Sequence, residues 1–373
     1  PIPNTKTYIE INNNISRDRT NLRNKLMNKL YSLFNSNKIK NLPKKITQKL
    51  YLNELLYKFI SKTVIKQIEN TIKYISDLYY FNSFDVINYF KNDYNDKSKF
   101  FTLKNGLDTL IYGMIAKIKS NNYTLHTNSH VNEIQYNNEE NLYNVIYKNN
   151  HNIKTIKSKY IVSALPRKDL IKFNILKPFK NIIDTVNDIN LTRIFEVYET
   201  NKNDVWFKNI KKTVTNNKVK FVIPINSQSG LIMSAYNDTQ NSKYWLNIQK
   251  RGDNFLKQIL NKNLNLIFSA FNVKVPNSKW IKLHYWDMGV AAWKKNVDSD
   301  LISKQVINLL PNFYICGENY SQYQAWCEGA LITSQEVLKK IYCDLDNKSK
   351  TRKSKTRKSK TRKSRIRKSK TRK

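Results

Sequence analysis

Glycine is scarce in this sequence of 373 residues, which contains seven glycines, the first of them at position 106. An average chain carries about 7% glycine. Loops that cradle phosphate groups depend on glycine, because a side chain would hold the backbone N–H groups away from the ligand. The first 105 residues therefore contain no glycine-rich phosphate-binding loop.

Cysteine, histidine and long apolar runs are also scarce. The three cysteines form no Cys-x-x-Cys pair, and the four histidines show no spacing typical of metal ligands, so we expect no metal site. No apolar run reaches the ~18 residues of a membrane span, and the N-terminal residues do not resemble a signal peptide. We expect no membrane span, reduced cysteines, and a cytoplasmic or nuclear location.

Acidic residues number 28 against 66 lysines and arginines, which gives a formal net charge of +38. Residues 348–373 hold 16 of these basic residues and no acid, in repeats of Lys-Ser-Lys-Thr-Arg. Such a segment cannot bury apolar surface, so we predict that residues 346–373 form a disordered tail. Its charge density predicts contact of residues 348–373 with nucleic acid or another polyanion through counterion release.

The rest of the chain is basic too, but Asn, Lys, Ile and Tyr are abundant throughout. These four residues have A/T-rich codons, so the basic excess of the body is weak evidence for a polyanion partner. A large DNA virus with an A/T-rich genome would be a natural source, and its particle a natural location.

Hydrophobic residues make up 40% of the chain and aromatic residues 12%, which is enough for a large core and excludes a wholly disordered protein. Residues 1–98 predict a mainly helical segment, because leucine and isoleucine recur at helical spacing, as at Leu26, Leu30 and Leu33. We interpret this segment as an ordinary helical layer.

From residue 99 the pattern becomes a mixture of helices and strands. Residues 99–166 predict a helix that begins after Gly106, a β-hairpin, and a return strand that ends before Pro166. Residues 167–304 predict a mixed sheet with helices, and residues 305–345 predict a strand, a turn and a helix. In residues 99–166 we also expect a polar connection at 151–159. In residues 167–304 we expect strands at 191–198, 219–225, 231–235 and 279–286, and a helix at 246–266.

The most informative stretch runs over residues 311–342. It predicts a buried strand over 313–316, a tight turn at 317–318, an aromatic-rich loop, and a helix with small residues in its first turn. Such a helix N-terminus presents backbone N–H groups and a positive dipole end to an electron-rich ligand. The stretch resembles the C-terminal flavin-binding signature of FAD-dependent amine oxidases and their relatives, which include protoporphyrinogen oxidases and phytoene desaturases.

Three further segments resemble the same family and occur in the family's order. Residues 101–110 resemble the element that begins the middle part of these oxidases. Residues 131–134 and 159–166 resemble the hairpin and the return strand of the FAD domain. Residues 286–293 resemble a stretch on the substrate side of the flavin.

The resemblance implies an α+β fold derived from an α/β architecture, in which an incomplete FAD-binding domain is interleaved with a substrate domain of mixed sheet and helices. It implies that FAD contacts the chain at Val131, Gly317, Glu318, Gly329 and Ala330. Glu318 would accept hydrogen bonds from sugar hydroxyls.

The resemblance also implies a substrate site. Trp293 and Trp326 fall where two aromatic rings flank the substrate in monoamine-oxidase-like members. The alternative, that both tryptophans are core residues, has about equal weight. Ala292 stands where covalently flavinylated members have cysteine, which implies noncovalent FAD. Arg193 falls near a family lysine that positions a water by the flavin. Arginine is rarely a neutral proton acceptor, so this position departs from the oxidase pattern.

The main departure is the missing G-x-G-x-x-G unit, which holds the FAD pyrophosphate in the family. One hypothesis is an amine-oxidase-like flavoenzyme, partner-dependent or inactive, whose nucleotide-binding unit comes from a separate chain or from an upstream part of a longer product. A second is a degenerate structural relative that binds nucleic acid through its tail. A third is an unrelated α+β binding protein. The order of the matches favours the first.

Overall fold

The computed structural model describes residues 8–11, 14–16, 19–72, 74–93, 103, 106–121, 123–201 and 204–345. Within them helices and strands are mixed along the chain, as an α+β fold requires. The predicted basic tail lies outside the described residues, so the predictions about its disorder and its polyanion partner stay predictions. No helix in the described part is long and apolar enough to cross a membrane.

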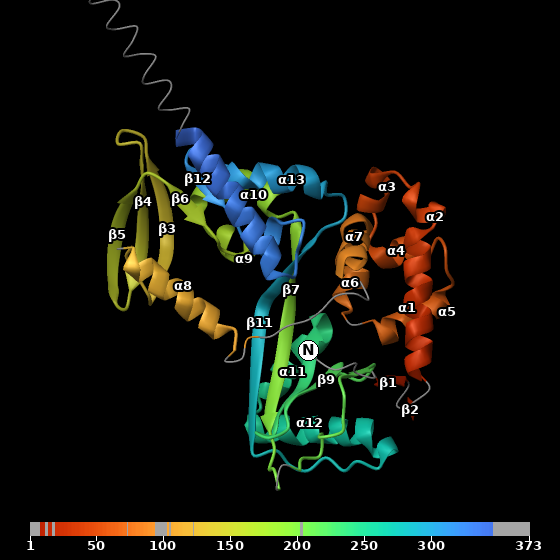
Figure 1. The fold of residues 1–373 in the computed structure, drawn as a ribbon. Helices are drawn as coiled ribbons and strands as arrows, with labels where there is room; N and C mark the ends of the chain where they lie inside the picture. Colours follow the sequence, from red (N-terminus) through yellow and green to blue (C-terminus); the bar gives the residue numbers. More distant parts are fainter. Residues whose placement is uncertain are drawn as a thin grey trace, which may run out of the picture.

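The N-terminal segment forms a layer of short helices, as its apolar periodicity predicts. In Figure 1 this layer lies to one side of two long central strands. Leu30, Phe34, Leu52, Ile68 and Phe90 are fully buried in its core. The helices are α1 (Arg19–Asn35), α2 (Asn37–Lys40), α3 (Lys44–Gln48), α4 (Leu52–Leu56), α5 (Lys62–Thr71), α6 (Ser76–Tyr79) and α7 (Ser83–Asp93).

The largest sheet has seven strands in the order β11-β7-β10-β9-β8-β1-β2. Its two long strands, β7 and the neighbouring edge strand β11, pair antiparallel on both sides of an irregularity between Trp286 and Val290. The sequence predicts that the second of these strands ends at Trp286, whereas the pairing continues to Trp293. The strands are β1 (Tyr8–Ile11), β2 (Asn14–Ser16), β7 (Val186–Val197), β8 (Thr213–Thr215), β9 (Phe221–Asn226), β10 (Leu231–Asp238) and β11 (Trp280–Trp293).

The two faces of β7 have different neighbours, because side chains alternate along a strand. Thr192 and Ile194 face helices α11 (Thr239–Gln249) and α12 (Asp253–Phe268), where the Thr192 and Ser242 hydroxyls lie 2.6 Å apart. The expected single helix over 246–266 is split between these two helices at Gly252, whose φ is +98°. The opposite face of β7 is directed to the helical layer.

Hydrogen bonds join the helical layer to the two long strands. The Asn82 N–H donates to the Trp293 carbonyl at 3.0 Å, and the Asn187 side chain donates to the Tyr80 carbonyl at 2.7 Å. Ile189 of β7 and Ala292 of β11 belong to the buried core of the helical layer. The layer is therefore packed directly on the end of the sheet that contains Trp293.

Two smaller sheets lie on the other side of the long strands β7 and β11 from the helical layer (Figure 1). One is the antiparallel series β3 (Ser129–Asn137), β4 (Leu142–Asn149) and β5 (Asn152–Ser158), and the other is the parallel pair β6 (Ile161–Ser163) and β12 (Phe313–Ile315). The hairpin and return strand were expected. Strand β5 was missed, because this edge strand is exposed along nearly its whole length and its composition is that of a polar loop.

The parallel pair is joined to the antiparallel sheet through Tyr143. Its hydroxyl donates to the Pro311 carbonyl at 2.6 Å, and its ring centroid lies 5.8 Å from that of Phe313. Shorter helices complete this part of the chain: α9 (Arg167–Leu170), η1 (Asn174–Phe179), α10 (Lys180–Ile183), α13 (Ser299–Gln305), η3 (Val306–Asn308) and η4 (Glu318–Tyr320).

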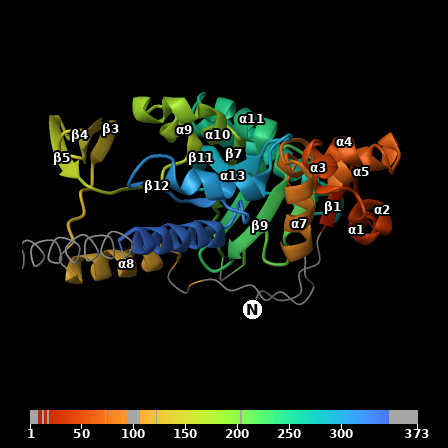
Figure 2. The ribbon, with the colours of Figure 1, turned by 90° about the horizontal axis from the view of Figure 1, so that it is seen from above.

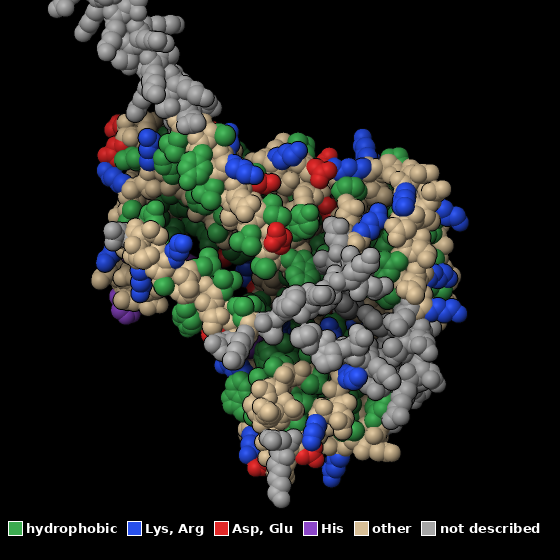
Figure 3. All heavy atoms as spheres, viewed as in Figure 1, with side chains coloured by type: hydrophobic (Ala, Val, Ile, Leu, Met, Phe, Trp, Pro, Cys, Tyr) green, Lys and Arg blue, Asp and Glu red, His purple; other side chains and the backbone are tan. Residues whose placement is uncertain are grey.

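Two helices on this side keep apolar side chains at the surface. Helix α8 (Asp108–Ser120) begins near Gly106 as predicted, but none of its residues is buried. The helix over residues 327–345 buries Val337 and exposes Leu338 and Tyr342. Figure 2 shows both helices on the same side of the molecule, and hydrophobic side chains show at the surface there in Figure 3.

Candidate functional site

The strand–turn–helix predicted at residues 313–345 is present, and its glycines have distinct surroundings. Gly317 has a φ of +124°, and its N–H donates to the Thr333 hydroxyl at 2.9 Å. A Cβ atom on Gly329 would lie 2.2 Å from Ser321 Oγ and 2.4 Å from the Tyr323 carbonyl oxygen. Gly329 is therefore needed for the loop to pack against the first turn of the helix, and the protein itself satisfies the Gly317 N–H.

Glu318 joins this turn to the central sheet. Its Oε1 accepts hydrogen bonds from the backbone N–H groups of Ala291 at 3.1 Å and Ala325 at 2.5 Å, and its Oε2 accepts one from Asn319 at 3.0 Å. Burial raises the pKa of this carboxyl group, while the two backbone donors favour its ionised form. The oxygens expected to receive sugar hydroxyls thus accept hydrogen bonds from the protein.

Val131 and Ala330 flank the same region. Val131 is half-buried on β3 and packs against the core cluster that contains Phe313 and Ile315 of β12. Ala330 is half-buried at the start of helix 327–345, where its carbonyl accepts a hydrogen bond from the Ser334 hydroxyl at 2.7 Å. The structure therefore places Val131 at the margin of the core cluster to which the β12 residues belong. Cofactor contact at either residue stays a prediction.

A pocket of about 240 Å³ lies between the central sheet, the helical layer and the loop before helix 327–345. We call it the Arg193 pocket. Arg193 and Leu191 come from β7, Tyr236 from β10 and Val290 from β11, while Ala325 and Trp326 come from the loop. The helical layer and the segments beside α6 and α7 contribute Tyr74, Ser76, Asp77, Phe81 and Tyr89.

Arg193 is held in this pocket by aromatic rings. Its guanidinium carbon lies 4.7 Å from the centroid of the Tyr236 ring and 5.8 Å from that of the Trp286 ring. Tyr236 is the residue opposite Arg193 in the pairing of β10 with β7, which explains their contact. The side chain is therefore fixed on the face of the sheet that is directed to the helical layer.

The two predicted tryptophans differ in position. Trp293 is only 1% exposed; its indole N–H donates to the Ser321 carbonyl at 3.1 Å and its backbone N–H to Gln324 Oε1 at 2.9 Å. Trp326 is 44% exposed and lines the Arg193 pocket. A much smaller cavity, of about 20 Å³, touches both tryptophans. The structure thus brings Arg193 and Trp326 to one cavity, whereas Trp293 lies in the core behind it.

The aromatic and acidic side chains from the helical layer were not among the expected site residues. Tyr74 and Tyr89 lie within a segment whose apolar periodicity indicates only core packing, and Asp77 has no motif around it. Tyr236 could have been found from its place opposite Arg193, but only with the register of the sheet known. No spacing along the chain identifies these residues in advance.

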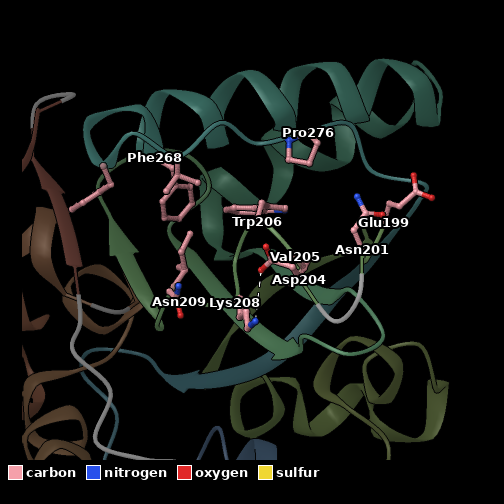
Figure 4. A pocket seen from close by; sticks show the side chains of 12 residues that line it. Glu199, Asn201, Asp204, Val205, Trp206, Lys208, Asn209, Phe268 and Pro276 are labelled. Carbon is pink, nitrogen blue, oxygen red and sulfur yellow. Dashed lines mark ion pairs between the residues drawn. The ribbon is translucent and has the colours of Figure 1, made fainter.

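A second and larger hollow, of about 670 Å³, lies at the other end of β7 (Figure 4). Trp206 forms part of its lining, and the indole N–H of Trp206 is buried without a hydrogen-bond partner in the described part. Asp204 and Lys208 line it as a pair 3.8 Å apart, with Glu199 nearby. The sequence analysis predicts no site there.

Among the described residues, no group of three or more histidine, cysteine, aspartate or glutamate side chains is placed to hold a metal ion. The described cysteines are free thiols: Cys316 is buried, and Cys327 and Cys343 are exposed.

Comparison with known proteins supports the fold. No family model and no curated sequence matches the chain. Among solved structures, cyclohexylamine oxidase from Brevibacterium oxydans IH-35A is similar with a TM-score of 0.62 at 11% identity, over 92% of this chain and 81% of that chain. A protein named as a protoporphyrinogen oxidase from Exiguobacterium sp. 255-15 is similar with a TM-score of 0.57 at 13% identity, over 87% of this chain and 73% of that one. The chain thus shares its overall fold with these two solved structures.

Proposed function

We propose that this protein is an FAD-dependent oxidoreductase of the amine-oxidase type, which holds the cofactor noncovalently and depends on a separate chain for the nucleotide-binding unit. The observation that carries the proposal is the Arg193 pocket. It lies between the central sheet and the loop of the strand–turn–helix, and two residues expected at the substrate site, Arg193 and Trp326, line it together. Similarity to an amine oxidase over 92% of the chain supports the same assignment.

The residues of this chain fit only one end of FAD. A Cβ atom on Gly317 would meet no atom nearer than the Ala164 carbonyl oxygen at 4.0 Å, so there is room for a ligand beside the turn. The Gly317 N–H and both Glu318 oxygens, by contrast, have protein partners. The first 105 residues contain no glycine to bring a backbone close to the pyrophosphate. We therefore assign the flavin end to this chain and the pyrophosphate end to a partner.

The surface beside the strand–turn–helix supports a partner. The strands β6 and β12 form a parallel pair, and parallel strands are normally covered on both faces. Val162 of β6 is nevertheless 51% exposed, and α8 buries none of its residues. We propose that a glycine-containing βαβ unit of another chain covers these apolar side chains and supplies the pyrophosphate site.

When bound, FAD would supply a two-electron oxidation, in which a hydride leaves a C–H bond of the substrate and a proton is released as a C–N or C–C bond becomes a double bond. Within this chain, Trp326 and the other rings of the Arg193 pocket would hold an apolar substrate by stacking and exclude water from it. Arg193 cannot take up a proton, so it would bind and orient the substrate. Glu318 would hold β11 against the loop that contains Ala325.

Flavin titration of the purified protein tests this proposal. We expect added FAD to bind weakly to the chain alone, seen as a loss of its fluorescence and a shift of its absorbance band near 450 nm. Gly317→Arg should abolish binding, because the new side chain fills the space beside the turn.

Gly252→Arg is the matched control for this substitution. Gly252 also has a positive φ and open space at its Cβ position, but it lies between α11 and α12. It carries the same backbone strain away from the site, so FAD binding should persist. Absence of FAD binding in the wild type, or equal loss in both variants, would contradict the proposed flavin site.

A further inference from the structure

Arg193 differs from Arg167, which is also half-buried. Arg167 forms ion pairs with Asp184 at 2.6 Å and Asp188 at 2.5 Å. Arg193 forms no ion pair with any described residue, and its Nε–H is buried without a hydrogen-bond acceptor there. Its Nη2 reaches only the Tyr236 hydroxyl, at 3.5 Å. The half-buried guanidinium therefore has no carboxylate partner among the described residues, which leaves it capacity for an anionic acceptor.

The surroundings of Arg193 keep the guanidinium in place without neutralising it. Tyr236 and Trp286 contact it through their rings, which leaves the Nη N–H groups that are not directed to the Tyr236 hydroxyl free to donate. Strand β7 pairs with β10 on one side and β11 on the other at this residue, so the backbone is also fixed. A planar, two-oxygen acceptor such as a carboxylate suits this fork.

The rest of the Arg193 pocket suits a flat apolar body. Most of its lining is aromatic or aliphatic, and Trp326 closes one side. Its volume of about 240 Å³ lies below the ~300–1,000 Å³ of pockets for drug-sized ligands. Asp77 is the one acidic residue in the lining, and it disfavours a ligand with two negative charges. The ligand is thus small, with one ring and one carboxylate.

We propose that the Arg193 pocket binds a small aromatic monocarboxylate, with its carboxylate on Arg193 and its ring among the aromatic side chains around Trp326. This inference names a ligand class for the pocket used in the proposed function, but the binding itself needs no flavin. A measurement without FAD therefore fails or succeeds independently of the flavin titration.

Isothermal titration calorimetry with three ligands of one shape tests the proposal: phenylacetate, phenylacetamide and phenethylamine. We expect phenylacetate to bind the wild-type protein at least about tenfold more tightly than its neutral amide, because a charge-assisted pair replaces a neutral hydrogen bond. Equal binding of the acid and the amide, tighter binding of the amine through Asp77, or no binding of phenylacetate at millimolar concentration would overturn it. These comparisons use the unmodified protein.

Two substitutions locate the effect. Arg193→Gln should abolish the preference for the acid, and Arg193→Lys should restore part of it, since lysine keeps the charge but loses the planar fork. Arg251→Gln is the matched control, because Arg251 is exposed and also lies over a ring, that of Phe255. It should leave the preference unchanged. A preference that survives Arg193→Gln would place the carboxylate elsewhere and refute the assignment.

Discussion

Gly317 and Gly329 belong to one sequence motif, but different physical constraints act on them. Gly317 is in the left-handed region of φ with room beside it, whereas Gly329 is in ordinary helical surroundings with atoms of Ser321 and Tyr323 where a Cβ would stand. A sequence pattern cannot separate these two reasons, because both select glycine. The motif identified the turn correctly, but which glycine approaches a ligand depends on packing.

Gly329→Ala tests the packing explanation at the scale of a single residue. The added methyl group would overlap Ser321 and the Tyr323 backbone, and overpacking of this kind lowers the free energy of unfolding by about 1–3 kcal/mol. Gly113→Ala in α8 is the control, because nothing lies within 4 Å of its Cβ position. It should stabilise the protein by about 0.5–1 kcal/mol. Urea denaturation measures both, and equal effects would refute the packing constraint.

At the scale of elements, the sequence predicted most of the central strands and the C-terminal strand–turn–helix, because their apolar alternation is strong. It missed β5, which is exposed nearly throughout, and it ended β11 at Trp286. The part of β11 after Trp286 is a strand because it pairs with residues about a hundred positions earlier in the chain. Local composition cannot predict a pairing over such a distance. The pocket was missed in part for the same reason, since Asp77 and Tyr236 join it only through tertiary packing.

The helix over residues 327–345 offers a direct test of which face packs on this chain. Val337 is 1% exposed, so Val337→Ala should lower the free energy of unfolding by about 1–3 kcal/mol. Its neighbour Leu338 is 52% exposed, and Leu338→Ala should change it by less than about 0.5 kcal/mol. Chemical denaturation of the two variants makes the comparison.

A large loss of stability in Leu338→Ala would mean that this face is already covered in the protein alone. The surface assigned to a partner unit would then be part of the chain's own core. A small loss keeps the face available, as the proposed βαβ partner requires.

At the scale of the whole molecule, the net charge of +38 is unevenly distributed along the chain. The predicted tail, residues 348–373, holds 16 basic residues without an acid, whereas acids and bases are mixed in the rest. Binding to a polyanion through the tail would be a property separate from ligand binding in the Arg193 pocket of the body. The tail should bind through counterion release, with strong salt dependence and no sequence preference.

Deletion of residues 348–373 tests this separation. We expect the shortened protein to lose most of its salt-sensitive binding to duplex DNA, measured by fluorescence anisotropy at several salt concentrations, while phenylacetate binding to the body stays unchanged. A full-length variant with the tail residues in scrambled order should bind DNA as the wild type does, because charge density and not sequence sets the affinity. If deletion leaves the slope of log K against log salt unchanged, the basic surface of the body carries the interaction, and the tail is only a solvated extension.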